Sequence, residues 1–189
     1  MNYTILVNKE FPLEENYIPS NLVITDNNEN NFHKFVNPNL KPMINEKVFE
    51  QFKKLQKAAI KDKYNFIIDS GYRSYSYQQE IFNSIELEKG IKYAKKYVAL
   101  PGYSEHQTGL AIDIAVIRNK IFCDELTIDE AEWLKNNAYK YGFILRYPEG
   151  KESITGYNYE PWHYRYVGEE LSTIIYKNNL TLEEYYKKS

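Results

Sequence analysis

The sequence predicts a single domain that contains both helices and strands. Its 189 residues fit one globular unit that can bury a core of its own. Apolar residues recur at helical spacing in some segments and alternate strictly in others, which are the patterns of amphipathic helices and half-buried strands. No internal repeat divides the chain. We therefore assign residues 1–189 to one domain, in which residues 1–45 form an irregular N-terminal wrap.

The N-terminal half predicts a wrap followed by helices and one strand. Residues 8–45 carry four prolines and an asparagine-rich run, a composition typical of irregular structure. Apolar positions at helical spacing predict a helix over 48–61, and the extended stretch at 66–68 follows it as a strand. Further helices are expected over 76–88 and 91–97, because Gly90 separates two segments without internal breakers.

Strict alternation predicts a strand with two different faces at residues 110–116. Its even-numbered positions are all apolar and would share one face, whereas Asp113 points to the other. The loop at Pro101 and Gly102 precedes this strand and brings His106 toward it.

A further helix and strand follow in the C-terminal half. Thr127 and Glu130 have the spacing of a capping box, so a helix should start there and run to Tyr141, with Gly142 directly after its end. The apolar residues after Gly142 predict a strand over 143–147.

The last predicted strand also has two unlike faces. Over residues 162–167, alternation places His163 and Arg165 opposite three aromatic side chains. Arg165 is left open between a solvated strand residue and a structural one. Thr181 and Glu184 form a second capping-box pattern, which predicts a closing helix.

Charge and composition exclude several classes of partner. The formal net charge is -2, with 24 basic and 26 acidic residues, and no basic stripe is present for a nucleic acid. The single cysteine, Cys123, excludes an internal disulfide and is interpreted as a small buried residue. Residues 5–7 are the longest apolar stretch near Met1, and no segment reaches membrane-spanning length. We expect a cytoplasmic protein, unless an export signal or anchor has been removed.

Three residues have the chemistry of a zinc site. His106, Asp113 and His163 offer two imidazoles and a carboxylate, and pairing of the two predicted strands would bring them together. Three protein ligands leave a fourth position open, which separates hydrolytic from structural zinc sites, because bound zinc lowers the pKa of water to roughly 7. The sequence therefore predicts zinc-dependent hydrolysis.

Two more residues complete the predicted chemistry. The chain has no HExxH motif, so Glu160, three residues before His163, is the candidate general base rather than part of a helical zinc motif. Arg73 is the candidate electrophile for the negative charge that develops on the scissile carbonyl oxygen. His33 has no spaced partners and is assigned no role.

Two spaced motifs resemble a known family. The segment Ser104–Asp113 resembles the SxHxxGxAxD signature of the zinc D,D-peptidases, and Glu160–His163 resembles their ExWH signature. With similar segments at 70–74 and 141–148, the likeness covers nearly the whole chain and is closest to the VanY and VanXY type of D-alanyl-D-alanine carboxypeptidase.

The resemblance implies a fold and a set of roles. The expected fold is a small α+β domain in which a central antiparallel sheet carries the zinc site and helices pack around it. Zn2+ would be held by His106, Asp113 and His163, with Glu160 as base and Arg73 on the scissile carbonyl or the oxyanion. The family pattern also suggests that Gln78 and Ser104 bind the peptide backbone or its terminal carboxylate.

The implied substrates are peptidoglycan precursors that end in D-Ala-D-Ala, namely the free dipeptide and the muramyl pentapeptide. Removing these ends would deplete the target of glycopeptide antibiotics. Residues 118–125 and 149–158 are candidate loops for the choice between substrates. The sequence leaves the oligomeric state open.

Three alternatives remain at this point. The same superfamily contains L,D-carboxypeptidases and peptidoglycan endopeptidases, which the motifs do not distinguish from D,D-carboxypeptidases. A zinc-bearing binding domain without activity, as in the hedgehog signalling domain, is the third. Glu160 argues against it, because a binding domain needs no general base.

Overall fold

An antiparallel sheet forms the centre of the molecule in the computed structural model, which describes residues 2–25 and 42–188. The main sheet has five strands in the order β3-β4-β7-β6, with β5 paired to β4. Its strands are β3 (Phe66–Ser70), β4 (Ala111–Arg118), β5 (Ile121–Cys123), β6 (Phe143–Leu145) and β7 (His163–Tyr166). The expected α+β class with a central antiparallel sheet is confirmed.

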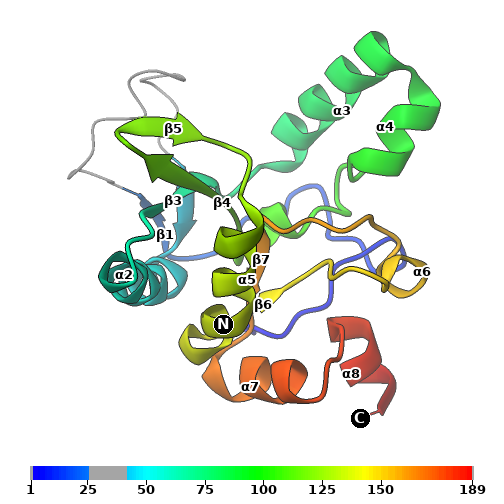
Figure 1. The fold of residues 1–189 in the computed structure, drawn as a ribbon. Coiled ribbons are helices and arrows are strands. Elements are labelled where there is room, and N and C mark those ends of the chain that lie inside the picture. The colour runs from blue at the N-terminus through cyan, green and yellow to red at the C-terminus, as the bar shows by residue number, and fades with distance from the viewer. Residues whose placement is uncertain (1, 26–41, 189) are drawn as a thin grey trace.

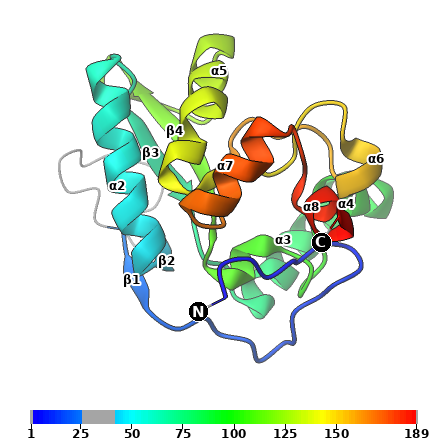
Figure 2. The ribbon, with the colours of Figure 1, turned by 90° about the horizontal axis from the view of Figure 1, so that it is seen from below.

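Helices flank this sheet unevenly (Figures 1 and 2). One face is covered by α2 and α5, α7 packs beside the edge strand β6, and α3 and α4 project from the opposite end of the molecule. The helices are α2 (Glu46–Lys61), α3 (Tyr75–Lys89), α4 (Ile91–Tyr97), α5 (Ile128–Asn137), α6 (Glu152–Thr155), α7 (Glu169–Lys177) and α8 (Leu182–Lys188), with 3-10 turns η1 (Glu105–Thr108) and η2 (Ala138–Tyr141). No helix within the described ranges has both the length and the apolar character that crossing a bilayer requires.

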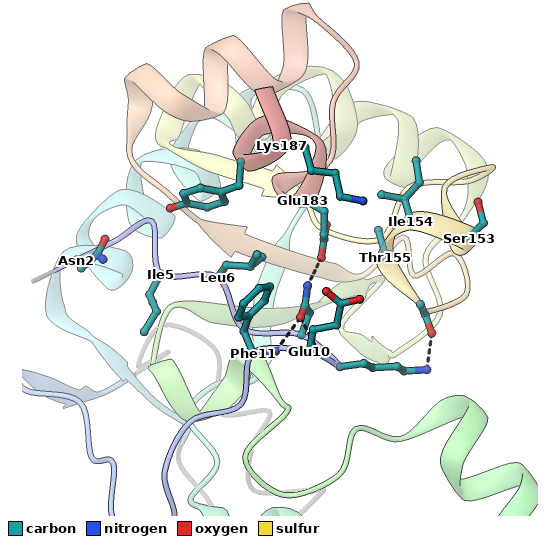
Figure 3. Close-up of a pocket in the computed structure, with 14 residues that line it drawn as sticks. Asn2, Ile5, Leu6, Glu10, Phe11, Ser153, Ile154, Thr155, Glu183 and Lys187 are labelled. Atoms are coloured by element: carbon teal, nitrogen blue, oxygen red, sulfur yellow. Dashed lines mark hydrogen bonds between the residues drawn. The ribbon is translucent and has the colours of Figure 1, made fainter. Parts of the chain in front are cut away.

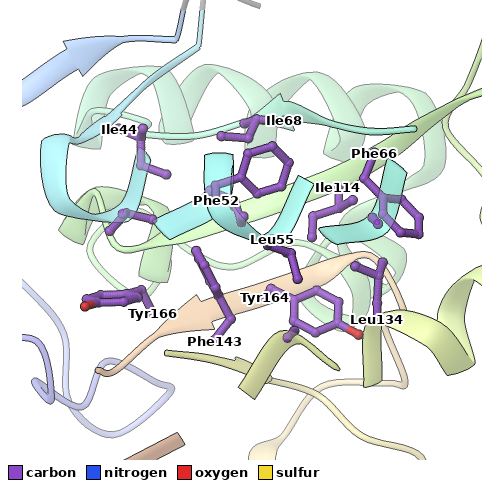
Figure 4. Close-up of a cluster of buried hydrophobic side chains, with 14 of the residues drawn as sticks. Ile44, Phe52, Leu55, Phe66, Ile68, Ile114, Leu134, Phe143, Tyr164 and Tyr166 are labelled. Atoms are coloured by element: carbon purple, nitrogen blue, oxygen red, sulfur yellow. The ribbon is translucent and has the colours of Figure 1, made fainter. Parts of the chain in front are cut away.

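The main core lies between α2, α5 and the covered face of the sheet (Figure 4). Phe52 and Leu55 from α2 pack with Ile114 of β4, Leu134 of α5 and Tyr164 of β7, and each is at most 1% exposed. Burying one such apolar side chain contributes about 1.5–3 kcal/mol. The apolar face predicted for residues 110–116 is therefore confirmed.

The opposite face of β4 and β7 carries the polar residues. In the ladder between these strands Asp113 is directly opposite His163, and Ala111 is opposite Arg165. Directly opposed residues of an antiparallel pair share a face, with their Cβ atoms about 4.5–5.5 Å apart. The strand pairing thus brings Asp113 and His163 together, as the sequence predicted.

Both predicted capping boxes are present. Thr127 Oγ1 accepts the Glu130 amide at 3.3 Å while Glu130 Oε2 accepts the Thr127 amide at 2.7 Å, and the same pair of bonds joins Thr181 and Glu184 at 3.2 and 2.8 Å. The helix after Thr127 was predicted to reach Tyr141, but the α-helix ends at Asn137 and tightens into η2. Gly142 follows η2 with φ of 87°, and a Cβ there would lie 2.5 Å from the Tyr166 ring.

Several short elements differ from the sequence-based expectation. The N-terminal wrap contains a two-stranded ladder of β1 (Leu22–Ile24) and β2 (Met43–Asn45), while its asparagine-rich run, its third proline and His33 lie outside the described residues. The supposed loop at 118–125 is largely the turn and second strand of the β4–β5 hairpin. Strands of three residues are too short for alternation to reveal, which is why β1, β2 and β5 were missed. The strand predicted over 143–147 is present as β6, which ends at Leu145.

Candidate metal centre

All seven residues proposed from the sequence line one pocket of about 190 Å³, which we call the metal-site pocket. They are Arg73, Gln78, Ser104, His106, Asp113, Glu160 and His163. A larger cavity of about 710 Å³ lies between residues 2–11 and helices α6 and α8, and it contains none of them (Figure 3). The chemistry of the lining, rather than the size of the cavity, therefore identifies the candidate site.

His106 lies on the 3-10 turn η1 rather than on an open loop, and this turn fixes its ring. Ser104 Oγ accepts the His106 amide at 3.4 Å, and Gly109, with φ of 69°, closes the turn. A Cβ on Gly109 would lie 3.0 Å from Leu22, so glycine permits the close approach. The carbonyl of Gly71 lies 2.6 Å from His106 Nδ1 and can only accept, so Nδ1 carries the hydrogen and Nε2 presents its lone pair.

Asp113 stands between the two imidazoles. Its Oδ2 is 3.2 Å from His106 Nε2 and its Oδ1 is 3.0 Å from His163 Nδ1. One ligand atom from each of the three residues can be chosen so that all lie within 4.8 Å of one another, and within the described residues only these three form such a group. The structure thus brings together the three proposed ligands.

A divalent metal requires deprotonated ligands, and two of the three proposed ligands are already in that state. The third, His163, must release a proton, because burial lowers its pKa but the carboxylates of Asp113 and Glu105 raise it to about 9. Burial and the nearby Arg73 lower the pKa of His106, so its imidazole is neutral. Burial opposes ionisation of Asp113, but both histidines and Arg73 hold its pKa well below the usual range. Two imidazole nitrogens and one carboxylate form the donor set of catalytic zinc sites, so the residues fit zinc.

Glu160 lies at the edge of this group. Its Oε2 is 3.8 Å from His163 Nδ1, and its side chain is 20% exposed. Burial raises its pKa to about 7, even though the neighbouring His163 acts in the opposite direction. A carboxylate with this pKa in a pocket can both accept and return a proton near neutral pH.

Arg73 reaches the same group from the segment after β3. Its Nη2 donates to Asp113 Oδ2 at 2.7 Å and lies 3.1 Å from His106 Nε2. Its Nη1 donates to Gln78 Oε1 at 3.3 Å, and Gln78 in turn donates to the Ala99 carbonyl at 2.9 Å. Gln78 therefore orients Arg73, a contact that the sequence did not indicate.

Sequence reasoning missed the residues directly behind the site. Glu105, inside the first motif, is 1% exposed, and Arg146 and Arg165 are fully buried. Arg165, which the sequence left open, is thus structural. Tyr147 and Tyr157 also line the metal-site pocket, and Tyr157 belongs to the predicted specificity segment 149–158. The adjacency of Glu105 to a metal ligand was the one available signal.

Known proteins match this chain over almost its full length. The family model described as VanY, D-alanyl-D-alanine carboxypeptidase, matches residues 41–169. The putative carboxypeptidase YodJ of Bacillus subtilis is 46% identical over 99% of this chain and 68% of its own length. The bifunctional D-Ala-D-Ala dipeptidase and carboxypeptidase VanXYC of Enterococcus gallinarum is 38% identical, with 98% of this chain and 94% of the relative covered.

Solved structures share this fold, and one of them contains zinc. The LD-carboxypeptidase LdcB has a TM-score of 0.81 at 44% identity and covers 97% of this chain, with 85% of LdcB matched. A variant of the vancomycin resistance D,D-pentapeptidase VanY in complex with Zn(II) has a TM-score of 0.82 at 35% identity, with 98% of this chain and 99% of that one covered. The chain therefore belongs to the VanY D-alanyl-D-alanine carboxypeptidase family and is a zinc metallopeptidase.

Proposed function

We propose that this enzyme removes the terminal D-alanine from peptidoglycan precursor peptides that end in D-Ala-D-Ala, the muramyl pentapeptide and the free dipeptide. The observation that carries the proposal is the convergence of His106, Asp113 and His163 in a pocket that also contains Glu160. The pocket volume of about 190 Å³ is below the range typical of drug-sized ligands, which suits the small end of a peptide.

The roles of the residues follow from their positions. His106 Nε2, a carboxylate oxygen of Asp113 and His163 Nδ1 would hold the zinc ion. When bound, zinc supplies a Lewis acid that polarises the scissile carbonyl and activates water. Glu160 takes a proton from the attacking water on its carboxylate and returns it to the departing amine, so one side chain serves both halves of the reaction.

Arg73 and its neighbours would bind the reacting group. Its guanidinium is permanently charged, and Gln78 and Ser70 hold two of its nitrogens, so Nη2 faces the pocket in a fixed direction. A fixed positive charge stabilises the oxyanion that forms when the carbonyl is attacked. Ser104, also in the pocket wall, is proposed to bind the terminal carboxylate of the peptide.

A second candidate is L,D-carboxypeptidase activity on tetrapeptides. The identity of 44% with LdcB, compared with 35% for the VanY variant, favours it. Both activities release a C-terminal D-alanine with the same catalytic residues. They differ in the residue before the bond, which is D-alanine in one case and an L-residue with a larger side chain in the other. The pocket wall around Tyr157 and Trp162 is where that difference would be recognised.

A substrate panel distinguishes these candidates. Zinc-loaded protein is incubated with D-Ala-D-Ala, a muramyl pentapeptide, a muramyl tetrapeptide and crosslinked peptidoglycan, and the products are identified by liquid chromatography with mass detection. We expect loss of one D-alanine from the pentapeptide. Cleavage of the tetrapeptide alone would replace the D,D assignment with the L,D one, and cleavage of crosslinks alone would indicate an endopeptidase.

The matched control is Glu160→Gln, which keeps the shape of the side chain and removes the base. Activity that persists in this variant belongs to a contaminant or to another mechanism. The cytoplasmic location suggested by the sequence stays a prediction, which fractionation of the source cells would test.

A further inference from the structure

A buried cluster of four charged residues lies directly behind His163. Arg146 donates from Nε to Glu105 Oε1 at 2.8 Å, and its Nη1 and Nη2 donate to Glu183 at 2.9 and 2.6 Å. Arg165 Nη1 donates to the same Glu105 Oε1 at 2.8 Å. The exposed fractions of the four side chains lie between 0% and 6%. Because two positive and two negative charges balance, the cluster can remain ionised in the protein interior.

The two carboxylate oxygens of Glu105 have different hydrogen-bond partners. Both guanidinium groups donate to Oε1, whereas Oε2 is buried without a hydrogen-bond partner. The Nε2 atom of His163 is also buried without a partner. These two atoms lie 3.6 Å from each other, so each is the natural partner of the other.

We propose that Glu105 is a positioning residue for His163. This proposal rests on the proposed role of His163 as a metal ligand. Glu105 Oε2 accepts the hydrogen of His163 Nε2 and thereby fixes the tautomer whose Nδ1 lone pair faces Asp113. A neutral imidazole carries one hydrogen, and only the nitrogen without it can bind a metal. A carboxylate behind a metal-bound histidine is known to orient the ring and to raise its basicity.

The arginines give this carboxylate one orientation. Arg165 Nη2 also donates to the carbonyls of Tyr3 and Ile5, at 3.2 and 2.6 Å, so it is held by the N-terminal segment. Arg146 is held by Glu183 of α8, which in turn accepts from Asn8 at 3.2 Å; Figure 3 shows Glu183 pointing from α8 toward this segment. Because both arginines donate to Oε1, they fix the rotation of the Glu105 carboxylate, and Oε2 faces His163.

This asymmetry makes Glu105→Gln an informative variant. The amide oxygen of glutamine is required at the two guanidinium groups, so its NH2 group must face His163 Nε2. A donor at that position favours the tautomer with hydrogen on Nδ1, which removes the lone pair from the metal side. Loss of such a supporting carboxylate typically lowers metal affinity 10–100-fold.

Zinc affinity measured by competition with a chelator is the test, and Glu183→Gln is the matched control. Both variants remove one carboxylate from the same cluster, but Glu183 does not contact His163. Its glutamine keeps an oxygen that can accept from Arg146, and Arg165 still donates to Glu105 Oε1, so the orientation of Glu105 is preserved. We expect zinc affinity to fall about 10–100-fold in Glu105→Gln and to stay within about twofold of wild type in Glu183→Gln. Equal losses in both variants would show general loosening and would overturn the proposal.

Two further measurements keep the test decisive. Unchanged affinity in Glu105→Gln, with reduced affinity in His163→Ala, overturns the role of Glu105 alone, whereas unchanged affinity in His163→Ala overturns the metal site itself. Should Glu105→Gln fail to fold, nitrogen-15 NMR of zinc-loaded wild-type protein reports the same contact. A slowly exchanging proton on His163 Nε2 is expected, and a proton on Nδ1, or rapid exchange at Nε2, contradicts the proposal.

Discussion

Replacing Glu160 with glutamine should stabilise the metal-free protein while abolishing most of its activity. Burial raises the pKa of this carboxyl from 4.5 to about 7, so the folded chain favours its protonated form. Because one pKa unit corresponds to 1.36 kcal/mol, the rise amounts to roughly 3 kcal/mol. The folded pKa is the higher one, so this stabilisation is complete below pH 4.5 and is lost as the pH rises to about 7. Glutamine resembles the protonated acid at every pH and avoids that loss.

The measurement is denaturant unfolding of chelator-treated wild-type and Glu160→Gln proteins at several pH values. At pH 8 the variant should be more stable by up to roughly 3 kcal/mol, and the difference should vanish near pH 4. The same substitution at the exposed residue Glu15 is the control for the general effect of removing one carboxylate. If the variant is equally or less stable than wild type at pH 8, burial does not destabilise the ionised form of Glu160, and the argument is refuted.

The functional half of this prediction uses the zinc-loaded protein. Removing a general base typically costs 10²–10⁴-fold in turnover. Zinc content should be retained, because Glu160 is not among the three proposed ligands. Unchanged turnover would reject Glu160 as the base, whatever the stability measurement shows.

Three other changes give separate checks. His163→Ala should lower zinc content measured by atomic absorption, since two protein ligands hold the ion poorly; full occupancy would contradict the assigned site. Burial works against the ionised form of Glu130, but hydrogen bonds from Arg118 and Thr127 hold its pKa below the usual range. Glu130→Gln should therefore lower the free energy of unfolding by about 1–2 kcal/mol at neutral pH. The wild-type protein should be the more stable one above about pH 4.5, and this difference should disappear as the pH falls further. If denaturant unfolding still shows the variant to be less stable at low pH, the ionised Glu130 is not the cause. Leu55→Ala, at a fully buried position of α2, should cost about 2–5 kcal/mol in the same assay, and a loss below 1 kcal/mol would show a core that collapses around the gap.

Periodicity was sufficient to predict the two strands that carry Asp113 and His163, although not the 3-10 turn that carries His106. The alternation around Asp113 and around His163 identified two-faced strands, because a half-buried strand needs apolar residues at every second position. Their pairing then followed from the chemistry of the two side chains. The ladder in which Asp113 lies opposite His163 has the register that this reasoning required.

Contacts between distant segments could not be read from the sequence. Arg146 and Glu183 are 37 residues apart, and neither lies in a pattern that distinguishes a buried ion pair from two surface charges. A charged residue is usually exposed, so sequence alone favours the wrong interpretation for such a cluster. Arg165 shows the same difficulty, since its partners include carbonyls 160 and 162 residues away.

The support behind His163 has a consequence for how the enzyme is made. Its anchors come from Tyr3 and Ile5 at one end of the chain and from Glu183 on α8 at the other. During synthesis, every proposed zinc ligand leaves the ribosome before α8 does. At that stage the chain still lacks Glu183, which binds Arg146. The charged cluster behind His163 is therefore complete only after α8 has emerged and packed near the N-terminal segment, which makes its assembly a late step in folding.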